Sequence, residues 1–442
     1  MLKAFGTAFK TPDLRKKILF SLMIIAIYRL GAHIPAPGVL LKNINECLDP
    51  SRLSQSQADV YSLVNLFSGG ALLQLSVFAL GIMPYITASI IIQLLVVVIP
   101  RFEMLKKEGQ SGQNKLTQYT RYLTIGLAVL QATGIIALAR SGQLFPGCDA
   151  TKFPILADKN SIFLYVILVL TMTAGATVIM WLGELLTEKG IGNGMSLLMA
   201  ASIAARIPTE GASIASRGST ILVMMILLAL VVIVVVVYIE QAQRRIPVQY
   251  AKRMIGRKMY GGTSTYLPLK VNQSGVIPVI FASSLLYIPQ LILQLQDQSK
   301  APGAVRRFFE TYVVSQSNWM HILIYLLLIV FFAYFYVAIT FNPEERADDM
   351  KRYGGFIPGI RPGRPTAEYL NYVLNRITLP GSLYLGIVAI LPNLLLTLTG
   401  PSGAQNFPFG GTAVLILVGV ALETVKQIES QLQQRSYEGF LR

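Results

Sequence analysis

The run "ILVMMILLALVVIVVVVYI" (Ile221 to Ile239) contains no charged residue, and its only polar side-chain group is the Tyr238 hydroxyl. Its length matches the ~20 residues that an α-helix needs to cross the hydrocarbon core of a bilayer. A second such run extends from Ile322 to Ile339. Helices are the spanning form that satisfies the backbone hydrogen bonds of such runs internally. The sequence therefore predicts an all-α polytopic membrane protein.

The composition of the whole chain agrees with this class. Of the 442 residues, 53% are hydrophobic and only 14% are charged. A soluble protein of this length needs more charged residues to cover its surface. The first hydrophobic segment follows Lys16 and Lys17, but no signal-peptide cleavage motif follows it. We therefore expect this segment to be retained as a span.

Ten segments qualify as spans, although the fifth is rich in small residues rather than strongly apolar. Small residues suit a helix that packs against other helices, away from lipid. The predicted spans lie near residues 18–34, 77–99, 119–139, 162–186, 193–210, 219–240, 275–296, 319–340, 376–398 and 411–429. An even number of spans places both termini on the same side of the membrane.

The net charge of +16 is distributed unevenly between the two sides. With the N-terminus inside, 27 of the 38 Lys and Arg residues fall in inner segments and ten in outer segments, while Arg29 lies within the first span. Lys and Arg in short loops mark the cytoplasmic side of a membrane protein. The sequence therefore predicts that the N-terminus and the C-terminus are both cytoplasmic.

Two inner loops, 241–274 and 341–376, are far longer than the ~2–8 residues usual between helices in bundles. They contain Tyr, Ile and Val, which disordered segments avoid, so we expect structured cytosolic protrusions. One alternative is that the loops bind anionic lipid headgroups, as polybasic juxtamembrane segments do. Acidic residues in the second loop weaken this alternative; they are Glu344, Glu345, Asp348 and Asp349.

Residues suited to catalysis or metal binding are scarce. Two cysteines and two histidines are too few for a Cys₄ or three-His zinc site, and the chain has neither H-E-x-x-H nor a phosphate-binding G-x-x-x-x-G-K-[ST] loop. We therefore expect no enzymatic activity, metal or cofactor, and assign any nucleotide hydrolysis to a partner. Cys47 and Cys148 both fall in predicted outer loops, where they are either two free thiols or a disulfide.

Ionisable residues within the predicted spans are few: Arg29, Glu184, Glu240 and Glu423. The first three lie near span ends, where snorkelling, capping or interface contacts explain them. Glu423 lies deeper, and either a helix–helix hydrogen bond or a functional role explains it. No ladder of carboxylates marks an ion path. Ten spans in two antiparallel halves of five nevertheless leave an inverted-repeat secondary transporter as an alternative.

Several apolar segments are interrupted near their starts. Residues 63–75 are apolar, broken by Ser68-Gly69-Gly70, and about half as long as a ~20-residue span. Non-helical backbone at membrane depth persists only where protein shields it or where it faces a water-filled cavity. Pro84 is predicted to loosen the helix that follows, and Pro278 repeats the pattern in the seventh span. These interruptions favour a channel over a transporter.

Six motifs, in order along essentially the whole chain, resemble the SecY family of bacterial protein-translocation channel subunits. They are "YRLGAHIPAPG" (28–38), "GIMPYITASIIIQLL" (81–95), "MWLGELLTEKGIGNGMS" (180–196), "YAKRMIGRKMYGGTSTYLPLKVN" (250–272), "GVIPVIFASS" (275–284) and "FIPGIRPGRPT" (356–366). The resemblance implies ten transmembrane helices in two inverted five-helix halves, 1–210 and 211–442. It also implies a re-entrant plug helix near residues 63–73 that blocks the outer side.

The function that the resemblance implies is the central subunit of the Sec protein-conducting channel. Such a subunit moves unfolded secretory proteins across the bacterial plasma membrane and releases membrane segments sideways into lipid. The implied partners are the small membrane subunits SecE and SecG, the SecA motor ATPase, the ribosome, signal peptides, unfolded preproteins and membrane lipid.

The resemblance assigns a ring of bulky apolar side chains that closes the pore: Ile82, Ile86, Met195, Met199, Ile280 and Ile416. The family commonly has isoleucine at all six positions, so the two flexible methionines imply a softer ring whose tightness against ions is open. A narrow apolar constriction dewets and stops ions without hydrogen-bonding the chain that passes. The alternative for Ile82 and Ile86 is simple packing against lipid or a neighbouring helix.

Three further groups follow from the same resemblance. The plug includes Leu63, Asn65, Phe67, Gly69 and Gly70. The side exit to lipid, the lateral gate, opens between the second and seventh spans, with Thr87, Gln131 and Asn272 as its polar cluster. The surface for ribosome and motor docking includes Arg244, Arg245, Arg253, Arg257, Lys258 and Arg361. Basic side chains suit ribosomal RNA phosphates, and the guanidinium of Arg361 suits carboxylates and phosphates alike.

Overall fold

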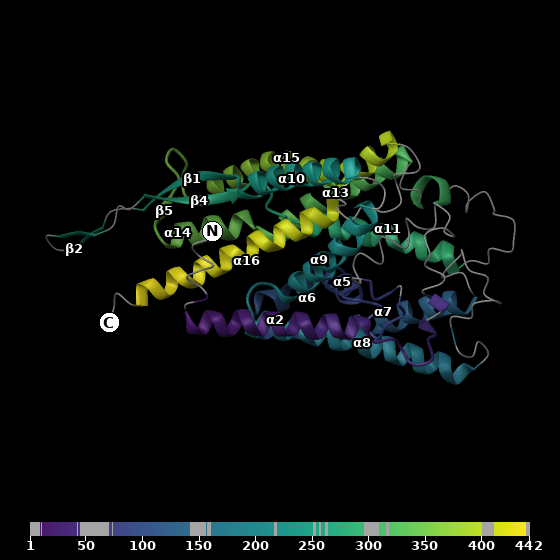
Figure 1. Cartoon of the computed structure of the whole chain (residues 1–442). Helices are drawn as coiled ribbons and strands as arrows, with labels where there is room; N and C mark the ends of the chain where they lie inside the picture. The colour runs from purple at the N-terminus through teal and green to yellow at the C-terminus, as the bar shows by residue number, and fades with distance from the viewer. Residues whose placement is uncertain are drawn as a thin grey trace.

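In the part of the chain that the computed structural model describes, there are ten long helices, which Figure 1 shows in their arrangement. The structure describes residues 9, 11–41, 43–44, 70–72, 74–141, 156, 161–215, 219–250, 253–255, 258–260, 264–295, 309–314, 318–399 and 411–438. The long helices are α2 (Pro12–His33), α5 (Met83–Val98), α7 (Gln110–Ser141), α8 (Ile162–Lys189), α9 (Gly194–Ala215), α10 (Ser219–Gln241), α11 (Ile277–Leu295), α13 (Trp319–Thr340), α15 (Arg364–Thr399) and α16 (Gly411–Glu438).

Each of the ten predicted spans overlaps one of these helices, so the all-α architecture with ten spans is confirmed. By length and hydropathy alone, five helices in the described part of the chain could each cross a membrane, or six if the bent pair α5 and α6 (Pro100–Lys107) counts as one span. Helix α9 contains the small-residue-rich fifth segment, and it contacts α2, α8, α10 and α16. This position agrees with the prediction that small residues there serve helix–helix packing.

The second span begins later than predicted, and Pro84 does not loosen it. Helix α5 starts at Met83 rather than near residue 77, which places Pro84 in the first turn. A proline is tolerated there because its missing N–H has no intrahelical partner in any case. The positive φ of Gly81, +57°, which glycine adopts readily, turns the chain into the helix. Pro278 occupies the same first-turn position in α11.

The sharp break in this region lies at the other end of α5. Helix α6 leaves α5 at 100°. Ile99 separates the two helices and has extended backbone angles, φ −105° and ψ 113°, because it precedes Pro100. Residues 100–107 therefore turn away from the direction of the span.

The described residues between 70 and 82, before α5, are non-helical and largely buried. Protein therefore shields the described end of the interrupted segment 63–75, as predicted for non-helical backbone at membrane depth. Backbone groups of these residues pair with the segment after α2: the Ala36 N–H donates to the Leu75 oxygen at 3.0 Å, and the Val77 N–H donates to the Ile34 oxygen at 2.9 Å. Of the five predicted plug residues, Gly70 has a φ of +94°. The others, Leu63, Asn65, Phe67 and Gly69, lie outside the described residues.

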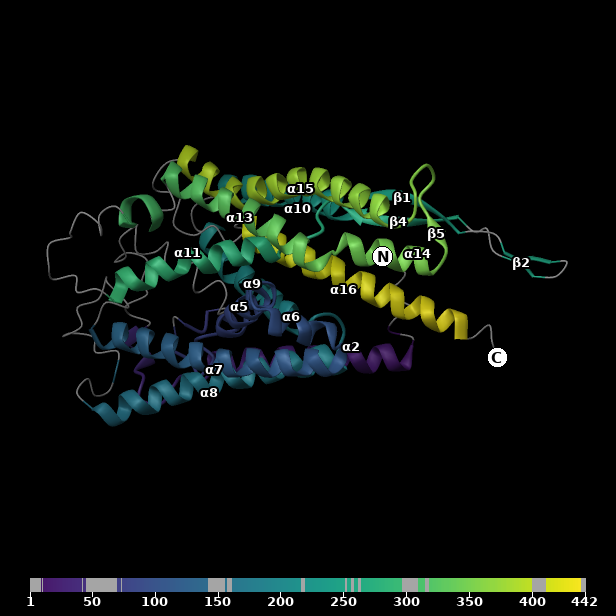
Figure 2. The ribbon, with the colours of Figure 1, turned by 180° about the vertical axis from the view of Figure 1, so that it is seen from behind.

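The helices form two layers with a repeated pattern of neighbours. In Figures 1 and 2, α2, α7 and α8 lie in one layer and α10, α13 and α15 in the other, with α5, α9 and α16 between them. In the first five spans α5 contacts α7, α7 contacts α8, α8 contacts α9, and α2 contacts α9. The same order recurs in the last five, where α11 contacts α13, α13 contacts α15, α15 contacts α16, and α10 contacts α16.

The two long loops fold together into one protrusion. Strands β1 (Gln243–Tyr250) and β4 (Ser264–Lys270) form an antiparallel hairpin, with the short strands β2 (Arg253–Ile255) and β3 (Lys258–Tyr260) toward its tip. The second loop supplies helix α14 (Pro343–Arg352) and strand β5 (Gly355–Phe356), which pairs with β1. The prediction of structured loops is therefore confirmed for their described parts.

The protrusion lies at one end of the molecule, together with the start of α2 and the end of α16 (Figure 1). This placement agrees with an even number of spans. At the opposite end, the short π-helix η1 (Phe309–Val314) packs against α11 and α13.

Candidate functional site: apolar ring, lateral gate and docking loops

The six side chains of the predicted ring belong to one buried apolar cluster. They come from four helices: Ile82 and Ile86 from the start of α5, Met195 and Met199 from α9, Ile280 from α11, and Ile416 from α16. Their exposed fractions lie between 1% and 9%. Residues from both halves of the chain are thus brought together between the two layers of helices.

This cluster contains two pairs of side chains, and the two members of each pair are one helical turn apart. The Ile86 N–H donates to the Ile82 oxygen at 3.2 Å, which continues the helical turn back through the first residue before α5. Met195 and Met199 are also four residues apart, within α9. Side chains at i and i+4 project from the same helix face, so each pair presents two apolar groups to the cluster.

The turn between α8 and α9 fixes where Met195 sits. The Asn193 side chain caps α9 by accepting the Met195 N–H at 3.1 Å, and the Thr187 hydroxyl accepts the Gly194 N–H at 2.8 Å. A Cβ atom at Gly183 would collide with the Met195 sulfur, so the absence of a side chain there makes room for Met195. In the "GNGM" segment (192–195), Asn193 therefore caps helix α9, and Met195, two residues later, is a predicted ring residue.

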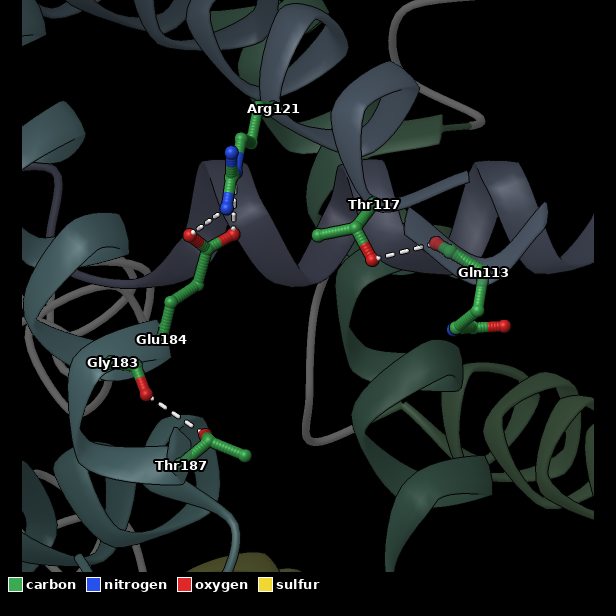
Figure 3. Close-up of polar contacts among 6 residues, drawn as sticks. All are labelled: Gln113, Thr117, Arg121, Gly183, Glu184 and Thr187. Carbon is green, nitrogen blue, oxygen red and sulfur yellow. Dashed lines mark hydrogen bonds and ion pairs between the residues drawn. The ribbon is translucent and has the colours of Figure 1, made fainter. Parts of the chain in front are cut away.

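An ion pair joins α7 and α8 (Figure 3). The Arg121 guanidinium donates from Nε to Glu184 Oε1 at 3.0 Å, and its Nη2 lies 2.7 Å from Oε2. Such two-pronged contacts between a guanidinium and a carboxylate are among the stronger polar interactions in proteins. The sequence predicted interface contacts for Glu184 but did not identify Arg121 as its partner. The available signal was that opposite charges occur at the cytoplasmic ends of two successive spans.

Of the three residues predicted for the lateral gate, Thr87 lies on α5 and Gln131 on α7, and both helices contact α11 of the other half. Asn272 lies before the start of α11. No hydrogen bond joins any two of the three. The Thr87 hydroxyl donates to the Met83 oxygen at 3.0 Å, and Gln131 is half-buried on α7. The Asn272 side chain is buried, with an exposed fraction of 3%. Its amide donates to the Glu240 carboxylate and to the Gly275 oxygen.

The hydrogen bond between Asn272 and Glu240 is, like the Arg121–Glu184 ion pair, a contact that the sequence analysis did not identify. Glu240 lies at the end of α10, before the hairpin, and Asn272 lies after the hairpin, before α11. Their hydrogen bond therefore closes the base of the hairpin. Glu423, for which the sequence left two explanations, has an exposed side chain on α16.

The two long loops of the protrusion share a small core of their own, which holds their shape. Ile246 and Leu269 from the hairpin pack in one cluster with Ile357 and Leu370 from the second loop and α15. Arg244 and Arg245 are exposed on β1. Arg253 and Lys258 lie on β2 and β3, but their side chains, and all of Arg257, fall outside the described part.

Arg361 is held in an exposed loop between β5 and α15. Gly359 and Gly363 flank it with φ values of +84° and +101°, which glycine tolerates far better than other residues. The Thr366 hydroxyl donates to the Arg361 oxygen at 2.8 Å. This backbone geometry leaves the guanidinium at the surface of the protrusion.

Among the described residues, no three His, Cys, Asp or Glu side chains come together in a group that could hold a metal ion. Cys47 and Cys148 lie outside these residues, so the choice between free thiols and a disulfide stays a prediction.

The whole chain is similar to known proteins. The family model "SecY" matches residues 76–425. A relative from Mycobacterium tuberculosis, "Protein translocase subunit SecY", is 63% identical over 448 residues, which is 100% of both chains. Among solved structures, "The structure of a protein conducting channel" superposes with a TM-score of 0.63 at 19% identity, covering 94% of this chain and 91% of that one. "Sec61 in the Canine ribosome-channel complex from the endoplasmic reticulum" gives a TM-score of 0.59 at 17% identity, with coverage of 94% and 91%.

Proposed function

The chain belongs to the SecY family and is the central subunit of a protein-translocation channel, and we propose that translocating polypeptides cross the membrane through its six-residue apolar ring. The observation that carries this proposal is that six large apolar side chains, from α9, α11, α16 and the start of the second span, are all buried members of one large apolar cluster that unites both halves of the chain. In this reading, residues 1–210 and 211–442 form two inverted halves, and the repeated order of helix contacts supports that division.

An apolar ring suits a cargo of arbitrary sequence. A passing chain forms no hydrogen bonds with the ring side chains, so none must be broken when the chain moves on. Water leaves a narrow apolar constriction when no chain fills it, and ions are then stopped because they cannot shed their hydration shells there. The residues near 63–73 block the outer side as a plug, and opening between α5 and α11 releases membrane segments into lipid.

The channel works with partners on its cytosolic side. The relative of this fold from the endoplasmic reticulum is named for its ribosome–channel complex. By analogy, Arg244, Arg245 and Arg361 on the protrusion bind the ribosome or the SecA motor, which supplies the energy for transport. SecE and SecG brace the channel within the membrane, and signal peptides and unfolded preproteins are the cargo.

The chain is a multi-pass membrane protein, and its orientation follows from its charges. We assign the end that carries the protrusion to the cytoplasm, because 27 of the 38 Lys and Arg residues fall in segments on that side. Both termini then lie in the cytoplasm of a bacterial cell, with the channel in its plasma membrane. The transporter alternative is not favoured, because the matching family and the matching structures are protein-conducting channels.

The function is tested by reconstituting the purified channel complex in vesicles with the SecA motor and an unfolded secretory protein. Transport is measured as the fraction of the secretory protein that becomes protected from added protease. We expect ATP-dependent protection, and we expect Arg361→Glu to lower its rate by about tenfold or more, because the reversed charge repels a carboxylate or phosphate on the partner.

Arg352→Glu is the matched control for this variant, since Arg352 is exposed on the same protrusion but lies at the end of α14, outside the "GIRPG" loop. It should retain most of the transport rate. No protection with the unmodified chain would contradict the channel function. Equal rates for Arg361→Glu and the unmodified chain would contradict only the docking role.

A further inference from the structure

The Arg121–Glu184 ion pair has a position that the channel function does not yet explain. Both residues lie within helices that are assigned as spans, Arg121 eleven residues after the first residue of α7 and Glu184 five before the last of α8. Charged side chains in spans are costly unless they are paired. Here the side chains are 47% and 20% exposed and meet through two contacts, so the pair links two adjacent helices directly.

On α8, the pair lies next to the position where the proposed ring residue Met195 packs against the helix. Gly183, which precedes Glu184, faces the Met195 sulfur so closely that it leaves no room for a Cβ atom. One turn later, the Thr187 hydroxyl donates to the Gly183 oxygen at 2.9 Å (Figure 3). The same hydroxyl accepts the Gly194 N–H at 2.8 Å. Residues 183–187 therefore hold the start of α9, and with it Met195, against α8.

On α7, the pair is part of a helix that packs against α5 and carries Gln131 of the gate's polar cluster. Helices α5 and α7 together therefore form one wall of the lateral gate, and α11 forms the other. Helix α7 contacts α5 in its own half and α11 in the other half. Movement of α7 away from α8 would separate the two charges.

We propose that Arg121 and Glu184 are positioning residues that hold α7, in one wall of the lateral gate, against the part of α8 that packs on Met195. Closure of the gate and closure of the ring are then coupled. The proposal rests on the proposed roles of the ring and the gate. When the pair is intact, α7 stays against α8 and the ring stays complete. When the pair is broken, α7 is free to move relative to α11, and the apolar ring loses the support on its α8–α9 side.

The proposal is tested by charge reversal and by exchange of the two charges. Arg121→Glu and Glu184→Arg each place like charges together, whereas the double variant restores an opposite pair with exchanged positions. Arg121→Lys keeps the charge but loses the two-pronged geometry. Spin labels at positions 130 and 285, which are exposed on α7 and α11, report the distance between the two gate walls. Ion efflux from vesicles reports the seal of the resting channel.

Each single reversal is expected to broaden the distance distribution and to raise ion efflux by roughly tenfold, as a lost close ion pair allows. The double variant should recover most of both properties, and Arg121→Lys should lie between. If a reversed chain fails to assemble, Arg121→Lys and the double variant still provide the comparison. A merely structural pair would change stability without moving the gate distance in the assembled protein.

The pair Glu103–Lys107 is the matched control. Its charges lie 2.7 Å apart and are exposed, but both belong to α6, so the pair links no two spans. The hydrogen bond from Lys107 lowers the pKa of the Glu103 carboxyl. Lys107→Glu should leave the gate distance and efflux unchanged. Unchanged gate distances in all Arg121 and Glu184 variants would overturn the proposal, whereas failure of the channel function would appear as absent protein transport.

Discussion

Replacement of all six ring side chains by serine is expected to raise the ion conductance of the resting channel by at least about tenfold while the helices remain folded. Hydroxyl groups allow water to stay in a narrow constriction, and a wetted constriction conducts ions. The six positions are Ile82, Ile86, Met195, Met199, Ile280 and Ile416. Conductance is measured as ion efflux from vesicles that contain the purified channel complex, without cargo or motor.

The same variant separates a pore ring from ordinary core packing. If the six side chains were plain core, truncating each would cost roughly 2–5 kcal/mol and the variant would not fold. A ring that closes a pore permits the exchange, because water that enters the constriction from the pore solvates the serine hydroxyls. Circular dichroism checks that the variant is folded. A double variant with only Ile82→Ser and Ile86→Ser changes fewer ring side chains and provides an intermediate comparison.

Leucine at the same six positions is the control for this prediction. Leucine conserves apolar character and approximate volume, so the leucine variant should remain as tight as the unmodified channel. Equal efflux from the folded serine variant and the leucine variant would contradict the apolar seal. A seal that improves with leucine would indicate that Met195 and Met199 soften the ring.

Gly194→Ala is expected to destabilise the protein strongly and to disturb the ring from the α9 side. The added Cβ atom would collide with the Gly183 oxygen and would lie 2.7 Å from the Thr187 nitrogen. Both neighbours are backbone atoms of α8, so no side-chain rotation relieves the contact. Overpacking of this kind costs typically ~1–3 kcal/mol or more. The displaced helix start would also carry Met195 away from its seat.

Thermal unfolding of the purified protein measures this effect, and Gly211→Ala is the control. Gly211 lies in the same helix, with no atom within 4 Å of the position that its Cβ atom would take. Alanine is about 0.8–1.0 kcal/mol better than glycine within a helix, so Gly211→Ala should leave the unfolding temperature unchanged or raise it. Equal unfolding temperatures for the two variants would show that the α8–α9 contact is looser than the structure indicates.

The positions of the spans could be predicted from the sequence because each depends on one local property, a long apolar run. Helices α10 and α13 match their predicted ranges nearly residue for residue. Helices α7 and α15 begin at Gln110 and Arg364, well before the predicted 119 and 376. Their first turns are polar and extend beyond the apolar runs, so hydropathy could not detect them.

The contacts within the site could not be predicted in the same way. Arg121 and Glu184 are 63 residues apart, and their meeting depends on how α7 and α8 pack. Asn272 was assigned to the gate by resemblance, whereas the structure pairs it with Glu240 across the whole hairpin. For Pro84, the outcome depended on where the helix began: inside the helix it would break the hydrogen-bond ladder, but in the first turn it does not.

The central claim is that the translocating chain passes through the six-residue ring, and cross-linking of a stalled secretory protein tests it most directly. Photoreactive side chains are introduced one at a time at positions 82, 86 and 280, and at position 230, which is exposed on the outer face of α10. We predict that the stalled chain forms adducts at 82, 86 and 280 and none at 230. Adducts elsewhere in the protein, with none at the three ring positions, would contradict the account.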